Sequence, residues 1–139
     1  MPAKFRFGLQ PLLELRRRIE EEQRQSYAAR RRELDDNARE VSRLTTELGA
    51  ALTGRFSVVH LACVDAAIAA RCCRTNRLEA DFERAQAALI AASRDRRVIE
   101  KLLERRRRAY DAQCARREEE ETEDANRRSH RSAQGDTRR

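Results

Sequence analysis

The chain has 139 residues, of which 40% are charged and only 4% aromatic, and it contains no tryptophan. This composition disfavours a compact globular core and is typical of an extended coiled coil. The 31 basic and 24 acidic residues give a net charge of +7, which favours an anionic partner but identifies none.

Helix-breaking residues are rare, and their positions predict where two long helices begin and end. Pro11 suits the first turn of a helix, where a backbone N–H has no partner. No glycine or proline lies between Gly54 and Gly135. We therefore expect an arm over residues 1–8, a first helix from about residue 9 to about residue 52, and a second from about residue 58 to about residue 126. The polar tail, residues 127–139, is expected to be disordered.

Gly54 and Ser57 predict a tight turn at residues 53–57. Glycine can adopt the left-handed conformation that ends a helix, and serine can cap the N-terminus of the next one. Gly49 is the alternative end of the first helix.

A heptad repeat runs through the second helix without a slip. One series is Thr75, Phe82, Leu89, Arg96, Leu103 and Tyr110, and the other is Leu78, Ala85, Ala92, Ile99 and Arg106. The first helix has a less regular seam: Leu9, Leu12, Arg16, Ile19, Gln23, Tyr27, Leu34, Val41, Leu44, Leu48 and Leu52. Steps of three and four place each set along one side of its helix, so each helix needs another beside it.

Folding the chain at the turn places the two seams against each other. Residues whose numbers add to about 110 then face one another, which brings Ile19 near Ala91 and Val41 near Ala69. The predicted fold class is therefore all-α: an antiparallel two-helix coiled-coil hairpin with a longer C-terminal helix. A parallel homodimer is the alternative, although it would need no break at Gly54.

The second helix is expected to outrun the first. Beyond about Arg105 its only expected partner is the arm, with Phe5 and Phe7, and apolar residues thin out there.

No motif in the sequence points to catalysis or to a bound cofactor. There is no phosphate-binding loop and no strand pattern, and His60 and His130 lack a nucleophile or carboxylate arranged nearby. The carboxylate runs at residues 20–22 and 118–121 fan around a helix surface, whereas catalytic pairs converge in a pocket. We expect no enzymatic activity, no catalytic residues and no cofactor.

The four cysteines are expected to be ordinary reduced thiols rather than metal ligands. They are Cys63, Cys72, Cys73 and Cys114, and no CxxC motif occurs. His60 lies three residues before Cys63, but no second ligand pair follows at the spacing of a zinc site.

The basic runs at residues 16–18, 30–32 and 105–108 do not form the continuous basic region of a basic-zipper protein. They are scattered, and an acidic run directly follows the first. Binding to nucleic acid is therefore disfavoured, and the four consecutive arginines are better suited to an acidic protein surface.

The longest weakly polar run, residues 61–70, contains Asp65 and is too short to span a bilayer. The N-terminus has no apolar region followed by a cleavage site. We expect a soluble, cytoplasmic protein.

Both ends of the sequence resemble the FliJ family, the small coiled-coil proteins of the flagellar type III export apparatus. The N-terminal motif reads FRFGLQPLLELR over residues 5–16 and is followed by three glutamates. The C-terminal pattern is looser: LLERRR over residues 102–107, then Arg117-Glu118-Glu119 and an acidic Glu123-Asp124-Ala125. Glu123-Asp124 inverts the family's usual order of the two acids.

The resemblance implies a fold and a role. Members of this family are antiparallel hairpins, similar to the central stalk of rotary ATPases, and they have no catalytic residues. They insert the end that carries both termini into the hexameric flagellar export ATPase and promote its assembly and activity. They also contact the cytoplasmic part of the export gate membrane protein and handle export chaperones. The protein would then act at the cytoplasmic side of the inner membrane, without inserting into it.

Two sets of contact residues follow from this expectation. The candidates for the ATPase are Leu12, Leu13, Arg16, Arg17, Arg105, Arg106, Arg107, Arg108, Tyr110, Arg116 and Arg117. The candidates for the gate or chaperones are Phe56, Val59 and Leu61, at the turn. Two alternatives remain open: the equivalent stalk of a virulence-type injectisome, and a generic structural coiled-coil homodimer.

Overall fold

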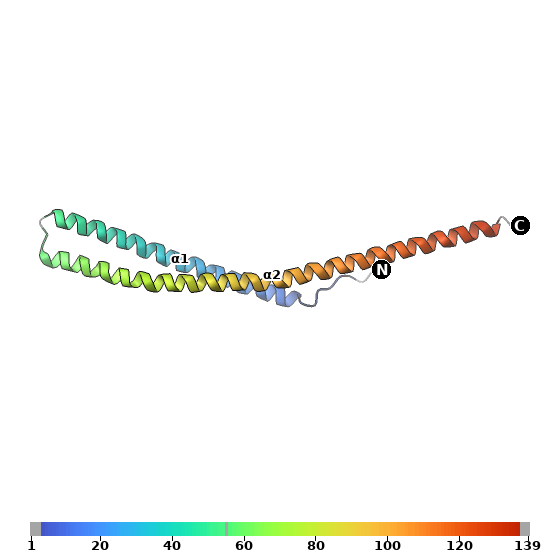
Figure 1. The fold of residues 1–139 in the computed structure, drawn as a ribbon, viewed down its shortest axis with the longest axis horizontal. Helices are drawn as coiled ribbons and strands as arrows, with labels where there is room; N and C mark the ends of the chain where they lie inside the picture. The colour runs from blue at the N-terminus through green and yellow to red at the C-terminus, as the bar shows by residue number, and fades with distance from the viewer. Residues whose placement is uncertain (1–3, 55, 137–139) are drawn as a thin grey trace. The chain divides into compact units, whose positions relative to one another are not determined.

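A computed structural model describes residues 4–54 and 56–136, and it contains two helices and no strand in these ranges. Helix α1 spans Gln10–Thr53 and has 44 residues, whereas helix α2 spans Val58–Asp136 and has 79. The two helices pack against each other on either side of a short turn (Figure 1). The predicted all-α hairpin with a longer second helix is confirmed.

The chain divides into two compact units. The hairpin unit, Glu14–Arg96, contains most of α1, the turn and the first half of α2. The terminal unit combines Met1–Leu13 with Arg97–Arg139 and so holds the arm, the start of α1 and the rest of α2.

The start of α1 follows from the proline in its first turn. The Gln10 N–H donates to the Phe7 carbonyl at 3.0 Å, and the Leu13 N–H donates to the Leu9 carbonyl at the same distance. Pro11 has no N–H to lose there. The helix begins one residue later than predicted.

The turn lies within the predicted residues, but Gly54 acts differently from the prediction. The Ser57 hydroxyl accepts a bond from the His60 N–H at 3.2 Å, which caps α2. No described glycine has a positive φ, so Gly54 does not use the left-handed conformation. It leaves room for an aromatic ring, because a Cβ at Gly54 would lie 2.7 Å from the Phe56 ring.

The α2 seam agrees with the heptad prediction. Leu78, Ala85 and Ala92 are buried, and Val64 extends the same series toward the turn. Phe82 from the other series packs against Tyr27 of α1, with ring centroids 5.0 Å apart.

Four buried residues of the α1 seam, Leu13, Glu20, Asn37 and Ala51, were not in the predicted seam. Leu44 is also buried, as predicted. The predicted Leu52 is 68% exposed, and Ile19 is only half-buried. The observed seam keeps strict steps of seven, through Leu13, Glu20 and Tyr27 and through Asn37, Leu44 and Ala51. Position in the heptad therefore determines which residues face α2, even where these residues are polar.

Contacts across the hairpin unit follow the predicted antiparallel register. The Asn37 amide donates to the Thr75 hydroxyl at 2.8 Å, and Arg16 pairs with Asp95 at 3.0 Å. In the terminal unit, Phe5 packs on Tyr110 with ring centroids 5.5 Å apart, so the arm meets α2 beyond Arg105 as expected.

The prediction of a disordered tail is wrong for residues 127–136, which continue α2 to Asp136. Local interactions explain the extension. Arg127 pairs with Glu123 at 3.4 Å and with Asp124 at 3.8 Å, and the Ser129 and Ser132 hydroxyls donate to carbonyls of the preceding turn. Residues 137–139 lie outside the described part of the chain.

Candidate interaction surfaces

The four arginines at residues 105–108 are all exposed, as their fanned arrangement on a helix requires. They are not equivalent. The Arg106 guanidinium lies 5.8 Å from the centre of the Phe7 ring, and Arg108 lies 3.8 Å from Glu104 on the preceding turn. Because these contacts engage only two of the four, the segment offers concentrated positive charge on a surface that is otherwise polar.

Tyr110 lies at the edge of this basic segment and is half-buried. A hydrogen bond with the Cys114 side chain, together with desolvation, raises the pKa of the Tyr110 phenol above its ordinary value. The ring is held by Phe5 from the arm. Arg116 and Arg117, about two turns further along α2, are exposed.

The candidates in α1 have unequal access to a partner. Leu13 is completely buried, so its side chain supports the fold and does not present a surface. Leu12 is half-buried and Arg17 is exposed. Arg16 is engaged by Asp95 of α2. Leu12 and Leu13 belong to the terminal unit with residues 105–117, whereas Arg16 and Arg17 belong to the hairpin unit.

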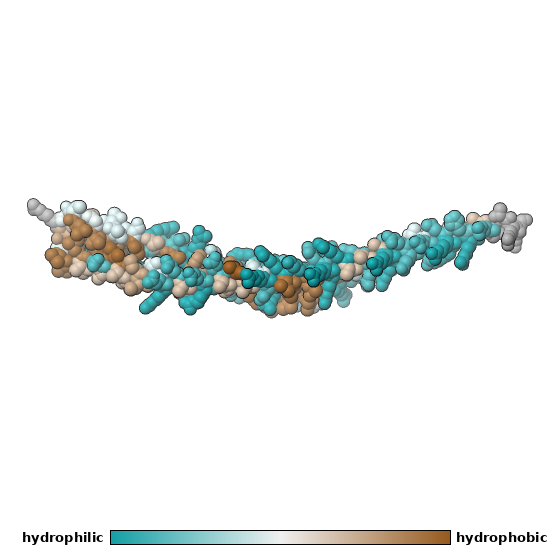
Figure 2. Space-filling view, in the orientation of Figure 1, coloured by the Kyte–Doolittle hydropathy of each residue, from teal (hydrophilic) through white to brown (hydrophobic). Residues whose placement is uncertain are grey.

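An exposed apolar patch surrounds the turn of the hairpin unit. Its members are Leu52 at 68%, Phe56 at 54%, Val58 at 81% and Val59 at 72% exposure. Figure 2 shows hydrophobic side chains gathered at this end of the hairpin. The predicted Leu61 is half-buried in the seam. Sequence reasoning placed Leu52 in the seam of the first helix and did not single out Val58, whereas both are exposed.

The Phe56 ring in this patch is held in place. It stacks on His60 with ring centroids 5.2 Å apart, and the His60 Nε2 lies 3.6 Å from Glu47 of α1. The patch therefore contains an aromatic side chain that its neighbours hold in position, and such side chains are common in docking surfaces.

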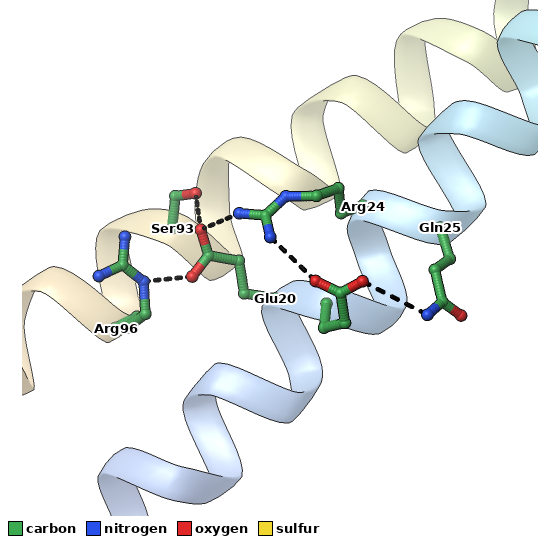
Figure 3. Close-up of polar contacts among 6 residues, drawn as sticks. Glu20, Arg24, Gln25, Ser93 and Arg96 are labelled. Atoms are coloured by element: carbon green, nitrogen blue, oxygen red, sulfur yellow. Dashed lines mark hydrogen bonds and ion pairs between the residues drawn. The ribbon is translucent and has the colours of Figure 1, made fainter.

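A polar layer interrupts the seam in the hairpin unit (Figure 3). Glu20 is buried, and its carboxylate accepts bonds from the Ser93 hydroxyl at 2.8 Å, from Arg24 at 3.3 Å and from the Arg96 guanidinium. The Ser93 bond and the bond and charge of Arg96 lower the pKa of the Glu20 carboxyl, against the opposing effect of burial. Ser93 and Arg96 lie on α2, so the layer joins the two helices.

Sequence reasoning placed Glu20 on a solvated face together with its acidic neighbours. The signal that could have located it was its heptad position, seven residues after Leu13 and seven before Tyr27.

Asn37 forms a second polar layer in the same seam. Its amide donates to the Thr75 hydroxyl and to the Arg71 carbonyl, at 2.8 and 3.3 Å. The Asn37 Oδ1 is buried without a hydrogen-bond partner. A buried asparagine of this kind costs stability and favours one alignment of two helices over others.

The described residues hold no group of three or more His, Cys, Asp or Glu side chains that could bind a metal ion. Cys63, Cys72 and Cys73 are exposed free thiols, and Cys114 is a half-buried one. None of the described helix stretches is long and apolar enough to span a lipid bilayer.

The candidate surfaces are thus an apolar patch at the turn and a basic segment in the terminal unit. Two buried polar layers join the helices of the hairpin unit. No protein-family model, curated protein or solved structure matches this chain.

Proposed function

We propose that this protein is a non-enzymatic stalk of the flagellar type III export apparatus, which inserts into the hexameric export ATPase and promotes its assembly and activity. The observation that carries the proposal is the N-terminal motif FRFGLQPLLELR at residues 5–16, placed at the start of an antiparallel hairpin.

The terminal unit supports the proposal through its charge and through the exposed, mainly polar side chains of residues 115–134. A stalk that engages six subunits needs a surface that is polar and not adhesive. From residue 115 to residue 134 every side chain is exposed, and residues 105–108 add four positive charges. Electrostatic attraction of this kind speeds association without requiring a large apolar interface.

The apolar patch at the turn supports a second contact. Leu52, Phe56, Val58 and Val59 lie in the hairpin unit, far along the chain from the basic segment. We assign this patch to the cytoplasmic part of the export gate or to export chaperones, since such apolar surface requires a partner. The protein would then act at the cytoplasmic side of the inner membrane.

The test combines the purified protein with the flagellar export ATPase of the same organism and measures ATP turnover and ring assembly together. Stimulation of both, saturating near one stalk per six ATPase subunits, is the expected result. No binding and no stimulation would refute the stalk function. Stimulation of an injectisome ATPase instead would transfer the protein to that branch.

A pair of variants tests the assigned surface. Arg105→Glu with Arg107→Glu should reduce stimulation by about tenfold, because both side chains are exposed and each reversal replaces attraction by repulsion. Arg128→Glu with Arg131→Glu changes the same charge in the last turns of α2 and should stimulate as the unmodified protein does. Equal stimulation by both double variants would reject residues 105–108 as the contact.

A further inference from the structure

Residues 105–122 of α2 have an exposed face that lies away from Phe5 and Phe7 of the arm. Phe5 and Phe7 of the arm lie against Tyr110 and Arg106. About half a turn around the helix is a second row of residues, again at steps of three and four. We call this row the free face, and all its side chains are exposed: Arg105, Arg108, Ala112, Ala115, Glu119 and Thr122.

The charges along this part of α2 are reversed about one midpoint, which lies between Gln113 and Cys114. Four arginines occupy residues 105–108, and four glutamates occupy residues 118–121. Arg106, Arg107 and Arg108 correspond to Glu121, Glu120 and Glu119 on the other side of this midpoint, and Arg105 corresponds to Thr122. Closer in, Asp111 on one side corresponds to Arg116 on the other, and Ala112 corresponds to Ala115. A helix with this arrangement presents opposite charges to a second copy of itself that runs antiparallel.

We propose that the free face binds the same face of a second copy of this chain, with the two α2 helices antiparallel. A two-fold axis passes between Gln113 and Cys114, as in a closed isologous dimer. Arg108 of each copy faces Glu119 of the other, so this ion pair occurs twice. The alanines at the centre let the helices approach closely.

The charge pattern selects this arrangement over a parallel one. A parallel pair in register places arginine on arginine at residues 105–108 and glutamate on glutamate at residues 118–121, and like charges that face each other are destabilising. The charge complementarity between the two copies also stops at a defined residue. One step beyond Arg105, Glu104 would face Glu123 of the second copy, so the interface covers residues 105–122.

The acidic half of the proposed interface contains a shallow groove. It is lined by Ala115, Glu118, Glu119, Thr122 and Glu123. In the proposed dimer the long side chains of the second copy's arginines lie over this groove. Because the interface is mainly charged, its affinity depends strongly on salt.

Charge reversal in the full-length protein tests the pairing. Arg108→Glu or Glu119→Arg alone should weaken the dimer. The dissociation constant, measured by sedimentation equilibrium, should rise by about tenfold or more. The double variant R108E/E119R restores opposite charges across the two-fold axis, and its affinity should return to within about threefold of the unmodified chain. Arg131→Glu, the same charge change outside the interface, should leave the dissociation constant unchanged.

Disulfide formation tests the register. Two chains that lack the native cysteines, one with Ala112→Cys and one with Ala115→Cys, are mixed and oxidised. The antiparallel register brings residue 112 of one copy beside residue 115 of the other, within disulfide distance. The mixed disulfide should exceed either homodisulfide by at least about fivefold, whereas a parallel pair would favour the homodisulfides.

A protein that stays monomeric at high concentration and low salt would overturn the proposal, as would preferred homodisulfides or a double variant without restored affinity. These measurements use this chain alone, so they do not depend on the stalk function. If that function also holds, the dimer covers Arg105 and Arg108 and competes with the ATPase, a consequence that rests on the proposed function.

Discussion

The hairpin unit and the C-terminal part of α2 are both helical, but different interactions hold them. In the hairpin unit Leu78, Ala85 and Ala92 are buried against α1. From residue 115 to residue 134, by contrast, every side chain of α2 is exposed. There the helix depends on ion pairs within one turn, such as Arg127 with Glu123, each of which contributes only about 0.2–0.5 kcal/mol.

This difference teaches that one continuous helix can have two levels of stability. Packing across a seam makes the opening of one turn depend on its neighbours in the other helix, whereas local ion pairs leave each turn nearly independent. We therefore expect the hairpin unit to unfold cooperatively and the C-terminal part of α2 to open at much lower free energy. The predictions that follow test each side of this comparison.

Truncating a seam residue should give the largest loss of stability. Leu78→Ala removes a side chain that is 6% exposed and leaves a space between the helices, so the free energy of unfolding should fall by about 2–4 kcal/mol. The measurement is urea unfolding followed by circular dichroism.

Leu52→Ala is the matched control, because it is the same chemical change at a residue that is 68% exposed. Its effect should stay within about 0.5 kcal/mol. Equal losses for the two variants would contradict the assigned seam.

Glu20→Gln should destabilise the hairpin by about 1–3 kcal/mol at neutral pH, because it replaces the buried carboxylate that pairs with the Arg96 guanidinium by a neutral amide. Glu21→Gln is the control: Glu21 is exposed and interacts with Arg24 and Gln25 of its own helix, so a change of a few tenths of a kcal/mol is expected.

The difference between the unmodified protein and Glu20→Gln should also depend on pH. The Ser93 bond and Arg96 hold the pKa of Glu20 below its ordinary value of 4.5, so the carboxylate contributes its full stability above that value. As the pH falls through the lowered pKa of the folded state, Glu20 protonates and this contribution is lost. Urea midpoints of the two proteins should therefore converge as the pH falls below 4.5 and through this lowered pKa. A difference that grows in acid would contradict the role of the ionised carboxylate.

Asn37→Leu should raise stability by about 1 kcal/mol, because it removes a buried carbonyl oxygen that has no hydrogen-bond partner. The Arg71 carbonyl keeps the bond that the Thr75 hydroxyl donates to it, at 3.0 Å. The thermal unfolding midpoint should rise. A lower midpoint would mean that the two hydrogen bonds donated by Asn37 stabilise the fold by more than its unpaired oxygen destabilises it.

The sequence predicts the seams only where apolar residues occupy them. In α2 the heptad positions are mostly apolar, so the pattern identified Leu78, Ala85 and Ala92 correctly. In α1 two seam positions carry the polar residues Glu20 and Asn37. A prediction that looks for apolar residues passes over such positions and selects an apolar neighbour, such as Ile19, instead. Packing geometry fixes which side of a helix is covered, and polar residues remain there when the other helix supplies hydrogen bonds.

The candidate surfaces were predictable to a similar degree. Exposure of residues 105–108 follows from four consecutive charges on a helix, and exposure of Phe56 and Val59 follows from their place at the turn. The burial of Leu13 depends on a choice between adjacent leucines at the start of α1, which only the packed structure decides. The helical tail was missed because a lack of apolar residues indicates disorder, whereas here ion pairs and serine hydroxyls support the helix locally.

Arg127→Ala should give the smallest effect, and a local one. It removes the pairs with Glu123 and Asp124, so hydrogen exchange of the backbone amides around residues 123–134 should speed up by about twofold. The urea midpoint of the hairpin should not change, because no seam residue is touched. Arg131→Ala, which removes the same side chain from the same segment without touching Glu123 or Asp124, should alter exchange less. If Arg127→Ala instead lowered the hairpin's midpoint, the C-terminal part of α2 would unfold together with the hairpin, and the separation into two levels of stability would be wrong.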